Sequence, residues 1–141
     1  VAKEMMKKSE KICENLYGLE LFGGKLALIQ GHGFSCFFIV QHFAEEEYIK
    51  KQIIQLALAG CSRFVLLGEQ SRIWCKMIEE SDKLLSGAEA RKILVRKAET
   101  VQQFTEMLKA DLLLKPFVPQ DYYLIYDDAA IYNEVREKVL G

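Results

Sequence analysis

The chain has 141 residues, of which 50% are hydrophobic and 28% are charged, with 19 basic and 20 acidic side chains. This length is typical of one domain, and the hydrophobic content is enough for a core, so extensive disorder is excluded. The formal net charge of −1 also argues against nucleic acid and anionic membranes as partners, because proteins that bind them carry an excess of Lys and Arg.

The first 33 residues are expected to form a helix followed by a hairpin. Met5, Ile12 and Leu16 recur at helical spacing, which predicts an amphipathic helix at the N-terminus. Gly23-Gly24 then separates two apolar runs, and a Gly-Gly pair readily adopts the positive φ angles of a two-residue turn. A β-hairpin over residues 19–29 is therefore predicted.

From residue 34 to residue 141, strand and helix patterns alternate. The first run, Phe34 to Val40, consists almost entirely of β-formers and predicts a buried central strand. The elements expected after it are a helix over 45–59 that ends at Gly60, a strand over 64–67, a helix starting at Ser71, a strand over 93–95, a helix after a Thr100/Gln103 capping box, a strand over 122–126, and a last helix introduced by Asp127-Asp128. Four strand-helix units predict a single α/β domain over residues 1–141, with a three-layer, doubly wound, mostly parallel sheet covered by helices on both faces.

Polar residues that follow the expected strands are the first candidates for a functional site, because open α/β sheets bind ligands at the carboxyl ends of their strands. These candidates are His42, Ser71, Arg72, Lys97 and Asp127. Together they offer an imidazole, a hydroxyl, two cations and a carboxylate, which suit a small polar ligand. Helix capping and solvation explain such residues in any doubly wound domain, and the sequence favours that interpretation.

The common catalytic and cofactor motifs are absent. Gly31-His32-Gly33 lies between two expected strands and lacks the third glycine of a dinucleotide site, and the turn at Gly68 is not followed by the Lys of a Walker motif. Asp127 and Asp128 lack the further carboxylates of a magnesium site, so helix capping is the favoured role for both. No cofactor, no metal and no catalytic residue is expected.

Histidine and cysteine provide weak candidates for chemistry. His42 is the better candidate for a general base because it follows a strand, but no nucleophile motif stands beside it. Cys75 lies between Arg72 and Lys76, the setting closest to a reactive thiol, although burial is favoured. The cysteines form no CxxC pair, so we expect reduced thiols and a cytoplasmic protein without a membrane span. They are Cys13, Cys36, Cys61 and Cys75.

An acidic, tyrosine-rich segment near the C-terminus is the other candidate site. Tyrosine is enriched at the centres of protein interfaces, and carboxylates steer basic partners, although burial of the tyrosines under helices is the favoured alternative. The candidate residues are Asp121, Tyr122, Tyr123, Asp128, Tyr132 and Glu134. With no catalytic motif, the sequence favours a small non-catalytic protein that binds another protein with a basic surface, as an adaptor, a regulator or an inhibitor of the immunity-protein kind. The alternative is a small-molecule-binding or enzymatic Rossmann-like domain, and homo-oligomers are left open.

Overall fold

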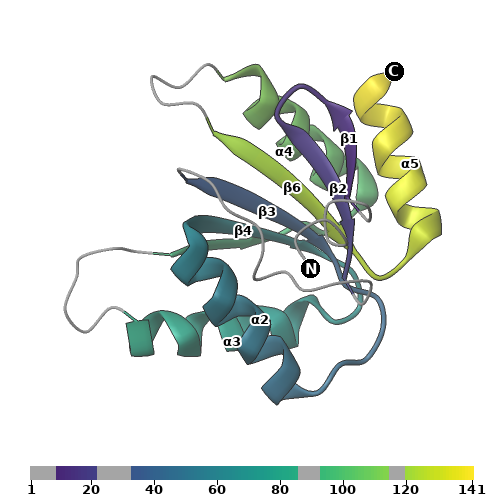
Figure 1. Ribbon diagram of the computed structural model, residues 1–141. Helices are drawn as coiled ribbons and strands as arrows, with labels where there is room; N and C mark the ends of the chain where they lie inside the picture. The colour runs from purple at the N-terminus through teal and green to yellow at the C-terminus, as the bar shows by residue number, and fades with distance from the viewer. Residues whose placement is uncertain (1–8, 22–32, 86–92, 115–119) are drawn as a thin grey trace.

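A computed structural model describes residues 9–21, 33–85, 93–114 and 120–141 of the chain. Within these residues the fold is α/β, with a six-stranded, mostly parallel sheet and four helices (Figure 1). The strands are β1 (Ser9–Cys13), β2 (Leu16–Glu20), β3 (Phe34–Ile39), β4 (Cys61–Leu67), β5 (Leu94–Lys97) and β6 (Asp121–Tyr126). The helices are α2 (Glu46–Ala59), α3 (Ser71–Leu85), α4 (Val101–Leu113) and α5 (Ala129–Leu140). None of the described helices is long and apolar enough to cross a membrane.

The strands lie in the order β1-β2-β6-β3-β4-β5. β1 is antiparallel to β2, and every other neighbouring pair is parallel. From β3 the chain runs outward through β4 to β5, and then returns to the other side of β3 to form β6. The direction of winding therefore reverses between β3 and β6, which is where ligand crevices form in open α/β sheets.

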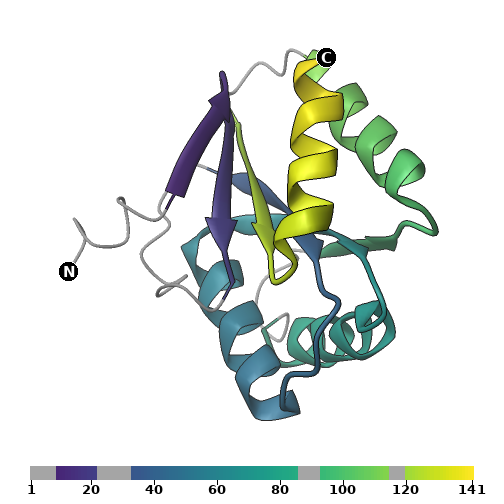
Figure 2. The ribbon, with the colours of Figure 1, turned by 90° about the vertical axis from the view of Figure 1, so that its right-hand side faces the viewer.

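β3 is the central strand that the sequence predicted, and all six of its residues are buried. Because side chains alternate along a strand, its two faces contribute to two separate cores. Cys36 and Phe38 pack with residues of α2 and α3, whereas Phe37 and Ile39 pack with residues of α4 and α5. Figures 1 and 2 show these two helix pairs on opposite sides of the sheet.

The four strand-helix units follow one another in the predicted order, and several predicted caps form. Gly60 ends α2 with a φ of 123°. The Thr100 hydroxyl accepts a hydrogen bond from the Gln103 amide at 3.0 Å at the start of α4. At the start of α5, the Asp128 carboxylate accepts from the Ile131 amide at 3.0 Å. Local patterns therefore located these helix ends correctly.

The predicted N-terminal helix is wrong over residues 9–17, which form β1 and the start of β2. Cys13 pairs with Leu16 across a two-residue turn at Glu14-Asn15, and Asn15 has a φ of 68°, a conformation that Asn adopts more readily than most residues. An N-terminal hairpin is therefore present, as the sequence predicted, and the one that the structure describes spans residues 9–20. Most of the predicted hairpin, residues 22–29, lies outside the described residues.

Contacts with α5 fix this hairpin to the rest of the sheet. The Tyr132 hydroxyl donates a hydrogen bond to Glu10 of β1 at 2.5 Å, and its ring stacks on Tyr126 with 3.9 Å between ring centroids. A Cβ atom at Gly18 of β2 would lie 2.0 Å from the Tyr132 hydroxyl. A side chain at position 18 would therefore force the Tyr132 ring to move.

Candidate functional site

The carboxyl ends of β3 and β6 are joined by the side chain of Asp127. Its carboxylate accepts hydrogen bonds from the Gln41 amide at 2.8 Å and from the His42 amide at 2.9 Å. The predicted capping role is therefore correct for Asp128 but wrong for Asp127, which binds the segment after β3 instead of its own helix. With each oxygen accepting a backbone N–H, this carboxylate stabilises the connection after β3.

Gly68 allows the turn after β4 to lie directly against the end of β3. Its φ is 125°, and a Cβ atom there would lie 2.4 Å from the carbonyl oxygen of Val40. Both the backbone conformation and the close approach therefore favour glycine.

The next three backbone amides of this turn all donate to acceptors within the protein. These bonds run from Glu69 to the Gln41 side-chain oxygen at 2.8 Å, from Gln70 to the Val40 carbonyl at 2.9 Å, and from Ser71 to the Gly68 carbonyl at 3.1 Å. Backbone amides at such turns often bind phosphate. Here they are used to hold the turn in place, so an anion near this turn has to be bound by side chains.

A pocket of about 460 Å³ opens at the carboxyl ends of β3, β4 and β5. Ser71, Arg72 and Lys97 line it, so the fold brings together three of the candidates selected from the sequence, whereas His42 and Asp127 do not line it. The remaining lining residues are Gln41, Leu67, Gly68, Glu69, Ala98, Glu99, Thr100, Val101 and Ile131. We refer to this space as the strand-end pocket.

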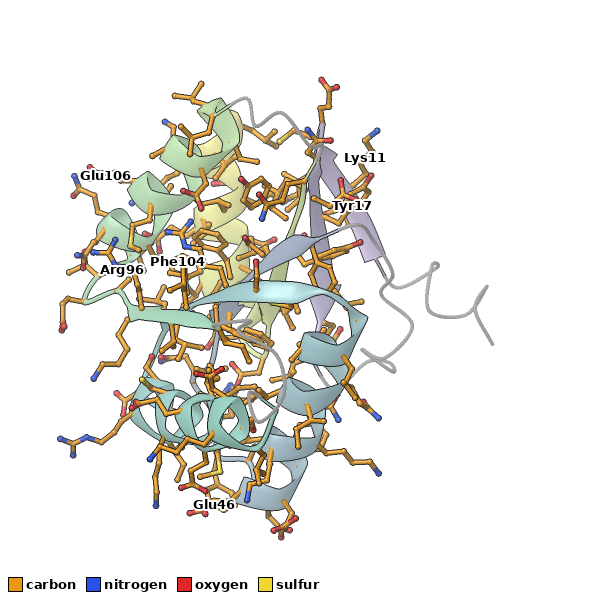
Figure 3. The ribbon with its side chains drawn as sticks, turned by 90° about the vertical axis from the view of Figure 1, so that its left-hand side faces the viewer. Lys11, Tyr17, Glu46, Arg96, Phe104 and Glu106 are labelled. Atoms are coloured by element: carbon orange, nitrogen blue, oxygen red, sulfur yellow. The ribbon has the colours of Figure 1, made fainter. Side chains whose placement is uncertain are left out.

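Both signs of charge surround the strand-end pocket. Arg72 and Lys97 are exposed cations, and Glu69 and Glu99 are exposed acids. Ser71 is buried, and its hydroxyl donates a hydrogen bond to the Gly68 carbonyl at 2.8 Å. Figure 3 looks onto β5, with α3 on one side of this strand and α4 on the other, and shows Arg96 pointing toward the α4 side. This environment suits recognition of a polar molecule by hydrogen bonds and charge.

The histidine candidates lie outside this pocket. The His42 side chain is 63% exposed, and its Nε2 atom lies 3.9 Å from a carboxylate oxygen of Asp128. Such an exposed contact contributes little to stability. His32 lies outside the described residues. Among the residues that the structure describes, no side chain of the strand-end pocket is paired with a histidine.

The thiols of Cys36 and Cys75 are not activated. Cys75 donates a hydrogen bond from its sulfur to Glu79 at 3.3 Å, and burial, followed by Glu79, raises the pKa of this thiol despite the opposing effect of Lys97. Burial also raises the pKa of Cys36 well above its usual value. A raised pKa disfavours the nucleophilic thiolate. Across the described ranges, no group of three or more His, Cys, Asp or Glu side chains is arranged to hold a metal ion.

The acidic, tyrosine-rich segment does not form one exposed surface. Tyr122 and Tyr132 are only 6% and 5% exposed, and both belong to the core beneath α4 and α5. Tyr123 faces the opposite side of the sheet, where it stacks on Tyr17 with 5.6 Å between ring centroids. Glu134 is exposed, whereas Asp121 and Asp128 are half-buried. Strand alternation and helices on both faces account for the buried tyrosines.

Other residues that line the strand-end pocket are not among the five strand-end candidates named above. Gln41 and Thr100 follow strands, as the selected residues do, so their position was the available signal. Ile131 comes from α5, and nothing local in the sequence predicts that it reaches a pocket formed by three other connections.

Comparisons of the chain with models of protein families, with curated proteins and with solved structures find no match.

Proposed function

We propose that this protein binds a small polar molecule in the strand-end pocket. The observation that carries this proposal is the convergence of Ser71, Arg72 and Lys97, from two different connections, on one pocket of about 460 Å³. This volume falls within the range of ~300–1,000 Å³ that is common for small-molecule sites.

The topology supports the same proposal. We infer a three-layer, doubly wound arrangement, because the chain winds outward from β3 with α2 and α3 on one face and returns to β6 with α4 on the other. Folds of this type bind ligands outside the carboxyl ends of their strands. The strand-end pocket lies at that edge, next to the reversal point that Asp127 stabilises.

The charges around the pocket suggest the chemistry of its ligand. Arg72 and Lys97 suit an anionic group, and Glu69 and Glu99 suit groups that donate hydrogen bonds. We propose binding without chemical conversion, because the Ser71 hydroxyl donates to a backbone carbonyl and the pKa of the nearby Cys75 is raised. The function we propose is therefore that of a ligand-binding protein.

Binding of a protein partner stays a prediction. The tyrosines on which it depended contribute to the two cores, so the exposed Glu134 is its main remaining support. Mass distinguishes the two functions, since a protein partner adds kilodaltons and a metabolite adds a few hundred daltons.

Native mass spectrometry of the protein isolated gently from its own cells tests the proposal. We expect an added mass of a few hundred daltons, and we expect the variant Arg72→Glu/Lys97→Glu to lose it. The matched control Lys51→Glu/Lys109→Glu reverses two exposed cations outside the pocket and is expected to retain the ligand. Loss of the ligand from both variants, or an added mass of several kilodaltons alone, would contradict the proposal.

A further inference from the structure

A second hollow, of about 370 Å³, lies along α3 and shares Arg72 and Lys97 with the strand-end pocket. Lys76 and Lys83 also line it. Residues four and seven positions apart lie on the same side of a helix, so Arg72, Lys76 and Lys83 form one line of cations on α3. Lys97 at the end of β5 adds a fourth cation.

These cations are not neutralised within the part of the chain that the structure describes. No salt bridge there includes Arg72, Lys76, Lys83 or Lys97. Two acids also line the hollow: Glu80 lies 3.7 Å from the Lys50 ammonium, and Glu79 accepts a hydrogen bond from the neutral Cys75 thiol, so four cations outnumber the acids. A chain with a formal net charge of −1 therefore concentrates positive charge beside its strand-end pocket.

Side chains provide the means to bind an anion here. The amides of Glu69, Gln70 and Ser71 already donate to protein acceptors, so they do not form a phosphate cradle of the Gly-rich type. A guanidinium offers a planar set of donors that matches phosphate oxygens, and lysine ammonium groups add flexible point charges. Arg72 with three lysines is suited to several anionic oxygens.

We propose that the hollow along α3 binds a phosphate or polyphosphate group of the molecule whose remainder occupies the strand-end pocket. This inference rests on the proposed function, and it adds the chemical class of the ligand. Arg72 and Lys97 line both spaces, so they contact the ligand where its polar body joins its phosphate. Lys76 and Lys83 line only the second space and bind the phosphate end alone.

Isothermal titration calorimetry with inorganic tripolyphosphate tests this inference. We expect the wild-type protein to bind tripolyphosphate, and Lys76→Ala/Lys83→Ala to weaken binding by roughly tenfold or more, or about 1.4 kcal/mol. Lys51→Ala/Lys109→Ala removes the same charge from exposed positions outside both hollows and is expected to bind like the wild type.

Three results would overturn the inference: no binding to the wild-type protein, equal weakening in both double variants, or tighter binding of a single-stranded RNA than of tripolyphosphate. The native mass measurement separates these failures from failure of the proposed function. A small-molecule adduct that persists in Lys76→Ala/Lys83→Ala with unchanged affinity would leave the strand-end pocket as a binding site and remove its phosphate subsite.

Discussion

Asp127 and Asp128 are adjacent in the sequence but have different structural roles. Asp128 caps α5 by accepting from an amide three residues later, a contact that a local pattern predicts. Asp127 binds the amides of Gln41 and His42, which are 86 and 85 residues away in the chain. Its role depends on β3 and β6 being neighbours in the sheet, which no local pattern specifies.

Replacing Asp127 tests its role as a connection between strands. Asp127→Ala removes the acceptor of two backbone amides, and because hydrogen bonds to a charged group contribute more than neutral ones, we expect the free energy of unfolding to fall by about 2 kcal/mol. Urea denaturation followed by circular dichroism measures this change. Asp121→Ala, at the other end of β6, is the control, and an equal loss in both variants would show that Asp127 has no special role.

At the scale of the element, β6 places neighbouring tyrosines on opposite faces of the sheet. Tyr122 packs beneath α4 and α5, whereas Tyr123 packs on the opposite face against Phe34, with 5.3 Å between ring centroids. Burial, followed by Asp121, raises the pKa of Tyr123 to about 12. The folded protein therefore favours the neutral phenol, and this preference makes its stability depend on pH.

We expect the protein to lose stability at alkaline pH. The pKa of a tyrosine phenol is about 10 in the unfolded chain and about 12 for Tyr123 in the folded protein. Below a pH of about 10 the neutral phenol makes its full contribution to stability. That contribution is lost as the pH rises toward about 12. Urea midpoints measured from pH 8 to pH 11.5, at steps of about half a unit, follow this loss. Tyr123→Phe removes the titrating group and should show a smaller decline than the wild type, whereas parallel declines would rule out Tyr123 as a contributor.

At the N-terminus, the predicted helix is the element for which sequence reasoning failed, because residues 9–13 and 16–20 form strands. Ile12 and Leu16 fit a helical period, but helix propensity is a weak determinant that tertiary contacts override. Here β2 pairs with β6 in parallel over five residue pairs, and Tyr132 binds Glu10 of β1. The available sequence signal was Asn15, because Asn is common in turns. In the structure this residue has a φ of 68°.

At the scale of the whole molecule, stability is expected to decrease from the centre of the sheet toward the edge at β5. β3 pairs with β4 and β6, and all its residues are buried. β5 has four residues, pairs with β4 alone among the described strands, and is largely exposed. Local opening requires least energy where few buried contacts are lost.

Native-state hydrogen exchange measured by nuclear magnetic resonance tests this gradient. The β3 amides should exchange only through global unfolding, with a free energy equal to that from urea denaturation. Hydrogen-bonded amides of β5 should exchange faster, through local opening with a lower free energy. Equal exchange free energies in β3 and β5 would instead indicate that the sheet opens as one cooperative unit.

The sequence by itself determined the class of fold, the order of the four strand-helix units and caps such as Gly60, Thr100 and Asp128. These features arise from periodicity and from contacts a few residues apart, so they are visible in a short window. Ser71, Arg72 and Lys97 were selected for the same reason, because each follows an identifiable strand. Their position relative to a sheet edge was predictable, although their convergence was not.

Only the tertiary structure decided the strand order, the hairpin at residues 9–20, the connection made by Asp127 and the composition of the strand-end pocket. Each of these depends on segments far apart in the chain becoming neighbours. Many strand orders satisfy the same local pattern, and the burial of the whole core selects among them. The same strand order places the tyrosines of β6 in the core, since β6 lies between β2 and β3.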